Sequence, residues 1–558
     1  MQSIKFCAAV ACIAPCCAHA GQALQTSDAL PRSLTVVEAA LLADDPLIAA
    51  GLDGYLQRGV PGSIPAGAVR CPGEYEPAEG ILMAYEGQSG WKRILDQMAA
   101  AITTAGGANV YVICDSAGEQ NTARSAMIAA GADGSRVFTY LRTTDSIWMR
   151  DYGPRYIYEG NGGANGDLGV RAIVDHTYNR PRPNDNLLPD FWASLRGETQ
   201  YQIPLIHGGG NYHLSGAGDS FSTRLIANEN PLLSDEDIVG LWREFQNLET
   251  ELVTPFPSSV DATQHIDMWM QIIADDAVVI ADWPLAPGSA QDLICDATAS
   301  LLAGRGYSVT RVPNIGNPFQ THFTFTNVVM CNDIVLLPRY DSVAQTYNDQ
   351  ALSAWQAALP GKQIIQIDCD AIVSAAGVMH CIVMHVPANA DGENPVVRVV
   401  EPAVGDLFEP GTLLPVTWRT DDDQKFAGGE LVIDVLLSTN DGMTFAVVST
   451  GETDDGEYLW TVPNIATAQG VLRVIARDAD GNTGFDDTDE NIIINGTDPA
   501  CNVADLAGPF GVLDLGDVQA FVNGFVSGSS AVDLAEPIGV LDLADLQAFV
   551  GAFVGGCP

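Results

Sequence analysis

The sequence predicts three folded parts in series: an α/β domain, an all-β sandwich and a small helical repeat. Short β-rich runs alternate with helical segments over residues 70–388, helices vanish over residues 394–496, and one pattern occurs twice over residues 500–558. Because a chain of 558 residues is too long for one hydrophobic core, several domains are expected.

The first part combines strand and helix patterns in alternation. β-rich runs occupy residues 110–113, 277–281, 334–337 and 363–367, and helical spacing of apolar residues occupies 91–105, 235–246, 290–303 and 348–358. Strands that alternate with helices predict an α/β domain, and this one is long for a single doubly wound sheet.

The second part reads as β-structure alone. Runs such as VVRVVEPA, LVIDVLLST and VLRVIARD are short, rich in β-branched residues and separated by turn residues. Strands at this spacing over about 100 residues predict an immunoglobulin-like sandwich for residues 394–496.

The last part contains an internal repeat, since residues 504–522 match residues 532–550. It resembles a dockerin-type module, which carries two calcium loops and binds a cohesin-like or cell-surface partner. Ala507 and Pro509 stand where such a loop has oxygen ligands, so calcium binding is expected to be weak or absent. The candidate ligands are Asp505, Asp514, Asp517, Asp533, Asp542 and Asp545.

The N-terminus predicts export. Lys5 precedes an apolar run at 6–17 and an Ala-His-Ala cleavage site at 18–20, the pattern of a secretory signal over residues 1–20. A lipid anchor on Cys16 or Cys17 is the lesser alternative. Residues 21–69 read as a leader or linker with one helical stretch. We therefore expect a secreted or cell-surface protein without a membrane span.

Charge and cysteine usage narrow the function classes further. A net charge of −44 repels nucleic acid and anionic membranes, so neither is an expected partner. Eight cysteines follow the signal, and Cys501 and Cys557, which bracket the tail, are the expected disulfide. If Cys381 is a free nucleophile, at least one other cysteine must also be unpaired.

Side chains of the α/β part suit a guanidinium substrate. A guanidinium is planar, always charged and presents a fork of donors, so its pocket needs carboxylates. Asp151 and Asp267 supply two, and Trp148 offers a ring on which a cation can stack. His265 lies two residues before Asp267, so on a strand both would face one way. Cys381, as a thiolate, can add to the guanidinium carbon.

Each of these residues also has a structural explanation. A lone cysteine is usually core, Asp151 can pair with its neighbour Arg150, and the glycines at 208–210 can form only a tight turn. The order and spacing of the segments over residues 148–381 favour a site.

Those segments carry a family resemblance. EYEPAEG at 74–80, WMRDYGP at 148–154, GGNY at 209–212, HID at 265–267 and MHC at 379–381 follow one another in the order found in the bacterial (Porphyromonas-type) peptidylarginine deiminase and agmatine deiminase family. Residues 71–386 resemble this family. The resemblance implies the pentein fold, a five-bladed α/β propeller around a central polar site.

The resemblance also implies roles. Cys381 falls on the family's nucleophile, His265 on its general acid/base, Asp151 and Asp267 on the guanidinium-binding carboxylates, and Asn327 on its active-site asparagine. The chemistry implied is covalent hydrolysis through a thiouronium intermediate, with no cofactor and no metal.

Arg180 and Arg182 bear on whether the substrate is peptidyl arginine or agmatine. They resemble the paired arginines with which the bacterial peptidyl enzyme holds a C-terminal carboxylate, and the alternative is that they pair with Asp175 or Asp185 in a surface loop. We therefore predict a secreted peptidylarginine deiminase that converts C-terminal arginine to citrulline and ammonia. An exported agmatine deiminase and a non-catalytic pentein scaffold that binds a partner remain the two alternatives.

Overall fold

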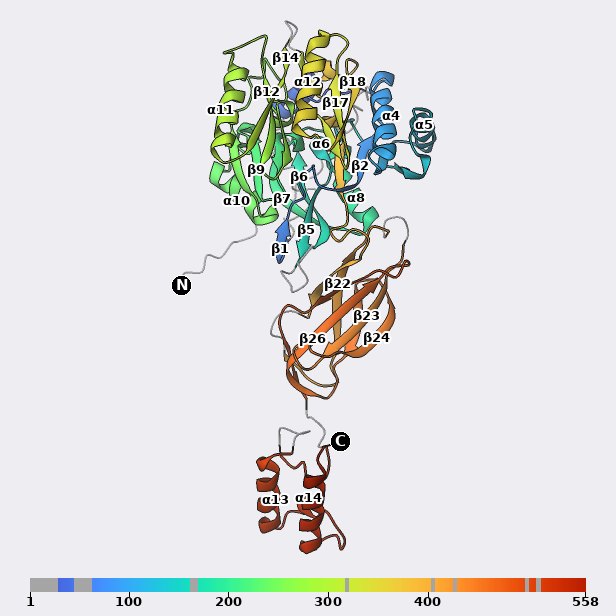
Figure 1. Ribbon diagram of the computed structural model, residues 1–558, viewed down its shortest axis with the longest axis vertical. Helices are drawn as coiled ribbons and strands as arrows, with labels where there is room; N and C mark the ends of the chain where they lie inside the picture. Colours follow the sequence, from blue (N-terminus) through green and yellow to red (C-terminus); the bar gives the residue numbers. More distant parts are fainter. Residues whose placement is uncertain are drawn as a thin grey trace, which may run out of the picture.

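The computed structural model describes residues 29–44, 63–160, 169–316, 321–402, 407–424, 429–496, 501–507 and 513–557. The predicted signal at 1–20 and its cysteines lie outside the described residues. Figure 1 shows an α/β body, a β region below it and a helical tail at the far end, in sequence order.

The α/β body is built from one strand pattern that recurs. In five sheets of the described chain an antiparallel strand pair is followed by a parallel neighbour, which the chain reaches through one or more helices. The sheet orders are β1-β5-β6-β7, β10-β9-β8, β11-β12-β13, β16-β17-β18 and β19-β2-β3-β4, and a short β14-β15 pair accompanies them.

The strands of this body are largely buried. In β3, five of the six side chains of NVYVIC are buried, the near-continuous apolar run of a strand covered on both faces. The strands are β1 (Ala68–Arg70), β2 (Ala78–Ala84), β3 (Asn109–Cys114), β4 (Val137–Leu141), β5 (Arg155–Gly160), β6 (Val170–Tyr178), β7 (Thr199–His207), β8 (Tyr212–Leu214), β9 (Asp219–Thr223), β10 (Glu249–Val253), β11 (Met270–Ala274), β12 (Ala277–Asp282), β13 (Ser308–Pro313), β14 (Ile315–Gly316), β15 (His322–Phe323), β16 (Val329–Cys331), β17 (Ile334–Arg339), β18 (Gln363–Asp368) and β19 (Met384–Pro387).

The helices of the body cover the sheets, and some of them begin at a residue whose side chain caps the helix. α10 starts at Ser234, whose side chain and that of Asp237 form a reciprocal capping box. α11 starts at Ser289, which accepts from the Asp292 backbone N–H. The α-helices are α4 (Ser89–Thr104), α5 (Ala117–Ala129), α6 (Met149–Tyr152), α7 (Pro183–Asn186), α8 (Leu188–Arg196), α9 (Leu225–Glu229), α10 (Asp235–Gln246), α11 (Ala290–Gly304) and α12 (Gln345–Ala358), and short 3₁₀ turns are η1 (Gly134–Arg136), η2 (Gly209–Asn211), η3 (Ile266–Met268), η4 (Val373–Ala375) and η5 (His380–Ile382).

The β region consists of two sheets that share one core. Val416 and Trp418 of one sheet and Ile433 and Val474 of the other are buried in the same apolar cluster. The strands are β20 (Val396–Glu401), β21 (Leu407–Phe408), β22 (Leu413–Asp421), β23 (Val432–Ser438), β24 (Ala446–Thr453), β25 (Glu457–Thr461), β26 (Ala466–Arg477), β27 (Thr483–Asp487) and β28 (Ile492–Asn495).

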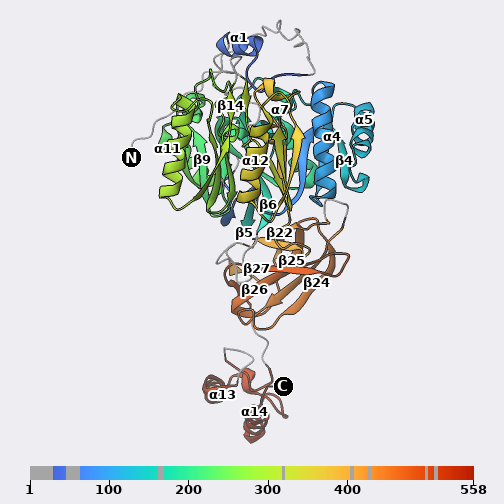
Figure 2. The same cartoon turned by 45° about the horizontal axis from the view of Figure 1, so that its top comes forward.

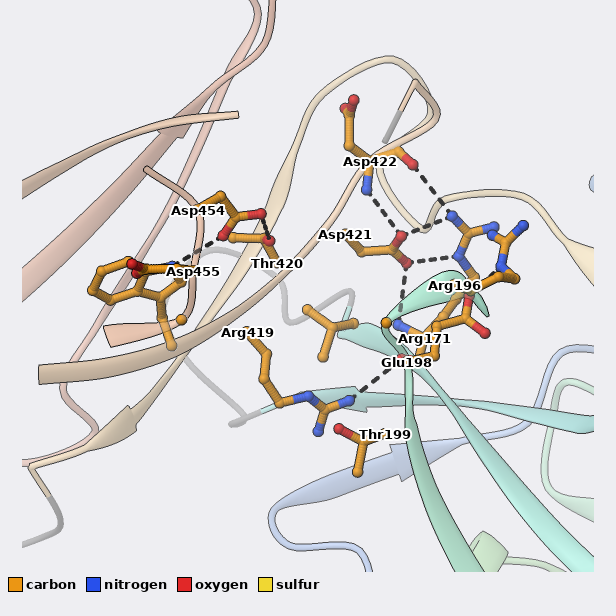
Figure 3. Close-up of a pocket in the computed structure, with 14 residues that line it drawn as sticks. Arg171, Arg196, Glu198, Thr199, Arg419, Thr420, Asp421, Asp422, Asp454 and Asp455 are labelled. Atoms are coloured by element: carbon orange, nitrogen blue, oxygen red, sulfur yellow. Dashed lines mark hydrogen bonds and ion pairs between the residues drawn. The ribbon is translucent and has the colours of Figure 1, made fainter. Parts of the chain in front are cut away.

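Buried ion pairs join the β region to the α/β body. Arg171 of β6 donates two hydrogen bonds of 2.7 Å to the Asp421 carboxylate, and Arg398 reaches Glu159 at 2.7 Å. Figure 3 shows Arg171 and Asp421 beside a cavity of about 270 Å³ at the junction, which Arg196 and Asp422 also line. This cavity lies away from the cysteine and carboxylate cluster described below.

The tail is a pair of helices closed by a disulfide. α13 (Leu515–Ser527) and α14 (Leu543–Gly555) pack Phe521 against Phe549 with ring centroids 4.2 Å apart, and η7 (Ser530–Val532) lies between them. Cys501 and Cys557 are bonded, which confirms the expected pair. Six other described cysteines are free, Cys381 among them. Within the described residues, no helix is long and apolar enough to cross a membrane.

A short N-terminal segment, residues 29–44, ends in helix α1 (Val36–Asp44). The backbone N–H of Thr35 donates to the Glu38 carboxylate at 2.7 Å, and the Glu38 N–H donates to Thr35 Oγ1 at 3.2 Å, so α1 begins with a capping box. Figure 2 shows α1 on the end of the α/β body opposite to the β region.

Candidate active site

The predicted site residues converge in the interior of the α/β body. Asp151 lies in the one-turn helix α6, Asp267 in η3 and Cys381 in η5, with His265 directly before η3. Asn327 lies in the turn between β15 and β16. Each of the five side chains is essentially inaccessible to solvent.

The sequence pattern suggested a strand for His265 and Asp267, but neither residue lies on a strand in the structure. Gln264 has a positive φ of 59°, which turns the chain, and the next residues form the 3₁₀ helix η3. Both side chains still reach the same guanidinium, because Nδ1 of His265 and the Asp267 carboxylate each lie within 3.0 Å of an Arg32 nitrogen.

Arg32 of the N-terminal segment fills the centre of this cluster. Its Nε and Nη2 donate to the two oxygens of Asp151 at 2.9 and 2.8 Å, a bidentate contact. Nη1 and Nη2 donate to the two oxygens of Asp267 at 3.0 and 2.9 Å. Nη1 lies 2.6 Å from Cys381 Sγ and Nη2 lies 2.7 Å from His265 Nδ1. The chain therefore places its own guanidinium between two carboxylates, a thiol and an imidazole.

The space for the guanidinium depends on a glycine. A Cβ at Gly210 would lie 1.8 Å from Arg32 Nη2 and 2.7 Å from an oxygen of Asp267. The Gly210 N–H also donates to Asp151 at 3.1 Å, which holds that carboxylate in place. The GGN turn of η2 is thus part of the wall around the guanidinium and not only a tight turn.

Burial and charge oppose each other at the carboxylates. Burial alone would raise the pKa of Asp151, but the Arg32 guanidinium and His265 outweigh it, so its pKa lies well below the usual range. Burial likewise opposes ionisation of Asp267, and Arg32 and His380 lower its pKa below the usual range. Both carboxylates are therefore ionised while a guanidinium is present.

The pKa of Cys381 shifts in the opposite direction to the pKa values of the two carboxylates. Burial raises the pKa of its thiol well above the usual range, with Asp267 and Asp151 acting in the same direction, and the positive charge of Arg32 lowers it in part. Asn327 Nδ2 lies 3.1 Å from Sγ and can donate to a thiolate. A guanidinium in the site therefore offsets part of the cost that burial and the two carboxylates impose on forming the thiolate.

A second layer of charged groups supports Asp267. His380 Nδ1 lies 3.0 Å from the Asp267 carboxylate, and its Nε2 lies 2.8 Å from Glu74. Glu74 also accepts from Arg150 at 2.7 Å. The sequence contained both signals, in the motifs EYEPAEG and MHC, but gave no role to Glu74 or His380.

Three predicted substrate-binding residues contact the main chain around Arg32. Arg180 Nε donates to the Arg32 carbonyl at 3.1 Å, and Arg182 Nη2 donates to the Pro31 carbonyl at 2.8 Å. Trp148 Nε1 donates to the Leu30 carbonyl at 2.8 Å. Trp148 therefore acts through its ring N–H, and the stacking face that the sequence predicted holds no cation in the described structure.

Arg182 also binds a carboxylate of the segment. Its Nε donates to Glu38 at 2.8 Å, both side chains being buried. The surface-loop pairing with Asp175 or Asp185 that the sequence left open is not the pairing found. Arg180 and Arg182 thus lie at the mouth of the site, where Arg180 contacts a carbonyl and Arg182 contacts both a carbonyl and a carboxylate.

A cavity of about 520 Å³ lies at this mouth. Ser33 and Leu34 of the segment line it together with Arg180 and Glu229. Burial raises the pKa of Glu229 to about 7, while its contacts with Asn179 and Arg180 lower it in part. A titrating carboxylate therefore lies near the arginine that contacts the bound main chain.

Comparison with known proteins agrees with this geometry. A sequence model described as "Porphyromonas-type peptidyl-arginine deiminase" matches residues 70–387, more than half of the chain. The chain belongs to this family. Its members hydrolyse a C–N bond of a guanidino group with a cysteine nucleophile, without a cofactor.

Relatives and solved structures cover the same part of the chain. A Marinomonas sp. (strain MWYL1) protein named "Putative agmatine deiminase" is 25% identical over 359 residues, 57% of this chain and 94% of its own. A Streptomyces avermitilis protein of the same name is 23% identical over 58% of this chain and 99% of its own. A solved structure of that name has a TM-score of 0.50 at 18% identity, over 57% of this chain and 96% of its own, which shows the pentein fold.

Four of the six candidate calcium ligands in the tail act as helix caps. Asp514 and Asp542 cap α13 and α14, and Asp517 and Asp545 complete the two capping boxes. Within residues 501–507 and 513–557, no three of the six aspartates come together as a ligand group. The repeat in the sequence therefore reflects two capped helices, and calcium gains no support from the geometry.

Proposed function

We propose that this family member is a peptidylarginine deiminase that prefers arginine at a C-terminus. The observation that carries the proposal is the contact of Arg180 with the carbonyl of the arginine held in the site. At a chain end this carbonyl becomes a carboxylate, which a guanidinium binds more strongly than a neutral carbonyl. Arg182, which binds the Glu38 carboxylate, adds a second positive charge at the mouth.

The arrangement supports a two-step reaction. The substrate guanidinium ion-pairs with Asp151 and Asp267 and lowers the cost of forming the Cys381 thiolate, which attacks the guanidinium carbon. His265, 2.7 Å from the nitrogen that Arg32 presents as Nη2, protonates the departing nitrogen, and ammonia leaves. His265 then accepts a proton from water, which attacks the thiouronium carbon and releases citrulline and free Cys381.

The alternative is an agmatine deiminase, the name given to the relatives. Agmatine has a primary amine where arginine has its carboxylate. That amine is positively charged at neutral pH and would face Arg180 and Arg182, which disfavours it. The half-buried Glu229 beside Arg180 is a feature of the mouth that favours an amine.

The test compares three substrates: a peptide ending in arginine, the same peptide with an amidated end, and agmatine. We would measure citrulline-type product and ammonia with a chain carrying Arg32→Ala, so that the segment does not compete, and with Cys381→Ala added as the inactive control. The free carboxylate is expected to give the highest kcat/KM. Turnover of agmatine alone would assign the other branch, and turnover of none would favour the scaffold.

Arg180→Ala tests the mouth directly. Loss of one charge-assisted hydrogen bond should lower kcat/KM for the free-carboxylate peptide about tenfold or more and leave agmatine unchanged or improved. Arg243→Ala is the matched control, because that arginine is exposed and pairs only with Glu249 among the described residues.

We propose further that the body is a five-bladed propeller, which the five recurring sheets support, and that the β region is an immunoglobulin-like sandwich, which the shared core of two sheets supports. The hydrophobic N-terminus and the disulfide support export to an oxidising compartment. We also propose that the dockerin-like tail attaches the enzyme to a cohesin-like or cell-surface partner. A pull-down with the full chain, with the tail-deleted chain as control, tests this attachment.

A further inference from the structure

Residues 29–44 present Arg32 to Cys381 as a substrate would. We propose that Arg32 is a self-modification site: Cys381 deiminates Arg32 of its own chain, and the citrulline formed releases segment 29–44 from the site. The inference rests on the proposed function, because it assigns that chemistry a first substrate within the chain.

The contacts around Arg32 comprise every group the reaction needs. Its guanidinium ion-pairs with Asp151 and Asp267, with side-chain exposures of 0 to 1%. The thiol lies 2.6 Å from Nη1 and the imidazole 2.7 Å from Nη2. These contacts would be the same for an arginine of another peptide, so an active site that converts a peptide arginine should also convert Arg32.

The main chain of the segment is bound as a peptide as well. Carbonyls of Leu30, Pro31 and Arg32 each accept a side-chain hydrogen bond from the body, and the Arg32 N–H donates to the Ala375 carbonyl at 3.0 Å. Together these four contacts hold the main chain of residues 30–32 across the mouth, where the chain bends at Arg32 and Ser33. Arg32 is therefore bound in the way expected of an arginine within a peptide.

The segment belongs to the same chain, which gives Arg32 an advantage over any free substrate. A tether raises the local concentration of a ligand to about the millimolar range when its length suits the span. A free peptide at lower concentration competes poorly with Arg32, so we expect Arg32 to react before added substrate does.

Conversion to citrulline removes the buried ion pairs of Arg32 and leaves the main-chain contacts and the Glu38 pair to hold the segment. The product is neutral, so its side chain no longer forms ion pairs with the two buried carboxylates. Among the side chains described over residues 29–42, the only other buried charge is Glu38, which pairs with Arg182. Apolar packing does not compensate, since Val36, Val37 and Leu41 of α1 are exposed by 89%, 57% and 39%. The segment should therefore dissociate after the reaction.

The step balances with water alone. The bond between the guanidinium carbon and Nη2 breaks, a bond from that carbon to a water oxygen forms, and ammonia leaves with the proton from His265. Cys381 forms and then loses its bond to the same carbon and is regenerated. No oxidant or reductant is consumed.

The experiment uses the full chain as purified, in wild-type and Cys381→Ala forms. Mass spectrometry of the proteolytic peptide that carries residue 32 should find citrulline in the wild type and arginine in the variant. Arg243 serves as an internal control: it is exposed and unrelated to the site, and it should remain arginine in both. Conversion of Arg243 to the same extent as Arg32 would overturn a specific self-modification.

Two further measurements complete the test. Wild-type enzyme mixed with the Cys381→Ala chain should leave Arg32 of the latter as arginine, and its conversion would overturn the reaction within one chain. Limited proteolysis should cut segment 29–44 faster in the wild type than in Cys381→Ala, and equal rates would overturn release.

A parallel assay with an added arginine peptide separates the two hypotheses. Turnover of the peptide with Arg32 unchanged overturns the self-modification and keeps the proposed function. No turnover of either arginine overturns both.

Discussion

Replacement of Gly210 by alanine should block the guanidinium site without unfolding the protein. The new Cβ would lie 1.8 Å from Arg32 Nη2, whereas non-bonded heavy atoms sit about 3.5 Å apart or more. The guanidinium must therefore retreat by roughly 1.7 Å, which takes its contacts of 2.8 to 3.0 Å with Asp151 and Asp267 out of hydrogen-bonding range.

The magnitude follows from the hydrogen bonds that this retreat breaks. A hydrogen bond to a charged group contributes about 1.5–3 kcal/mol, so breaking two of the four bonds to the carboxylates costs about 3–6 kcal/mol. Since about 1.4 kcal/mol corresponds to a factor of ten, kcat/KM should fall by roughly 10²- to 10⁴-fold. The assay is ammonia release from an arginine-ended peptide in the Arg32→Ala background.

Gly240→Ala is the matched control. Gly240 lies in α10 with nothing within 4 Å of the added Cβ, so activity should not change and the helix should gain about 0.5–1 kcal/mol. If Gly210→Ala keeps kcat/KM within about threefold of its parent while remaining folded, guanidinium substrates do not bind where Arg32 lies, and the site assignment is refuted.

Three further predictions address the carboxylates, the mouth and the domain junction. Asp267→Asn keeps the shape of the side chain but removes the buried negative charge that pairs with the guanidinium. The loss of about 2 kcal/mol or more in binding should lower kcat/KM roughly 30-fold, and an unchanged kcat/KM would show that Asp267 does not bind the substrate. Glu229 has a pKa raised by burial to about 7 from 4.5, so above that pH its carboxylate weakens Arg180: KM for the arginine-ended peptide should rise through about pH 7, and Glu229→Gln should flatten the rise. Stability should also depend on pH. Between pH 4.5 and about 7 the folded state holds a proton on Glu229 that the unfolded state has lost, so the free energy of unfolding of the wild type, relative to Glu229→Gln, should fall as pH rises through this range. Asp421→Ala leaves the buried Arg171 without one partner and should lower the thermal stability of the junction by about 3 kcal/mol, whereas Glu249→Ala, at an exposed pair, should leave it unchanged; equal effects would contradict a structural role for the junction pairs.

The regular elements of the α/β body could be predicted because their signals are local. Helix α10 occupies residues 235–246, as expected, since Ser234 and Asp237 cap it and its apolar residues follow helical spacing. Strands β3, β12, β17 and β18 contain the predicted runs with one or two residues added at their ends. Ends of strands depend on neighbouring strands, which a single sequence does not display.

The site was predicted in composition but not in its local conformation. Asp151, His265, Asp267, Asn327 and Cys381 are brought together as the family resemblance implied. The strand expected for His265 and Asp267 was wrong because the pattern HID carries no mark of the turn at Gln264. The roles of Glu74 and His380 arise from packing across the fold, which their motifs do not encode.

Arg32 lay beyond the reach of sequence reasoning. It contacts Cys381 across 349 residues of chain, and no motif surrounds it. The one local signal was the helical stretch that follows, whose Thr35 and Glu38 form a capping box. That pattern predicts a helix start and says nothing of where the preceding arginine points.

The position of α1 shows on which side of the molecule the active site opens. Helix α1 lies on one side of the α/β body, while the β region and the tail extend from the opposite side (Figure 2). The opening that segment 29–44 covers is therefore at the pole of the body that faces away from the β region. Anything that holds the tail leaves this pole facing outward, so approaching chains would meet the opening first and the point of attachment last.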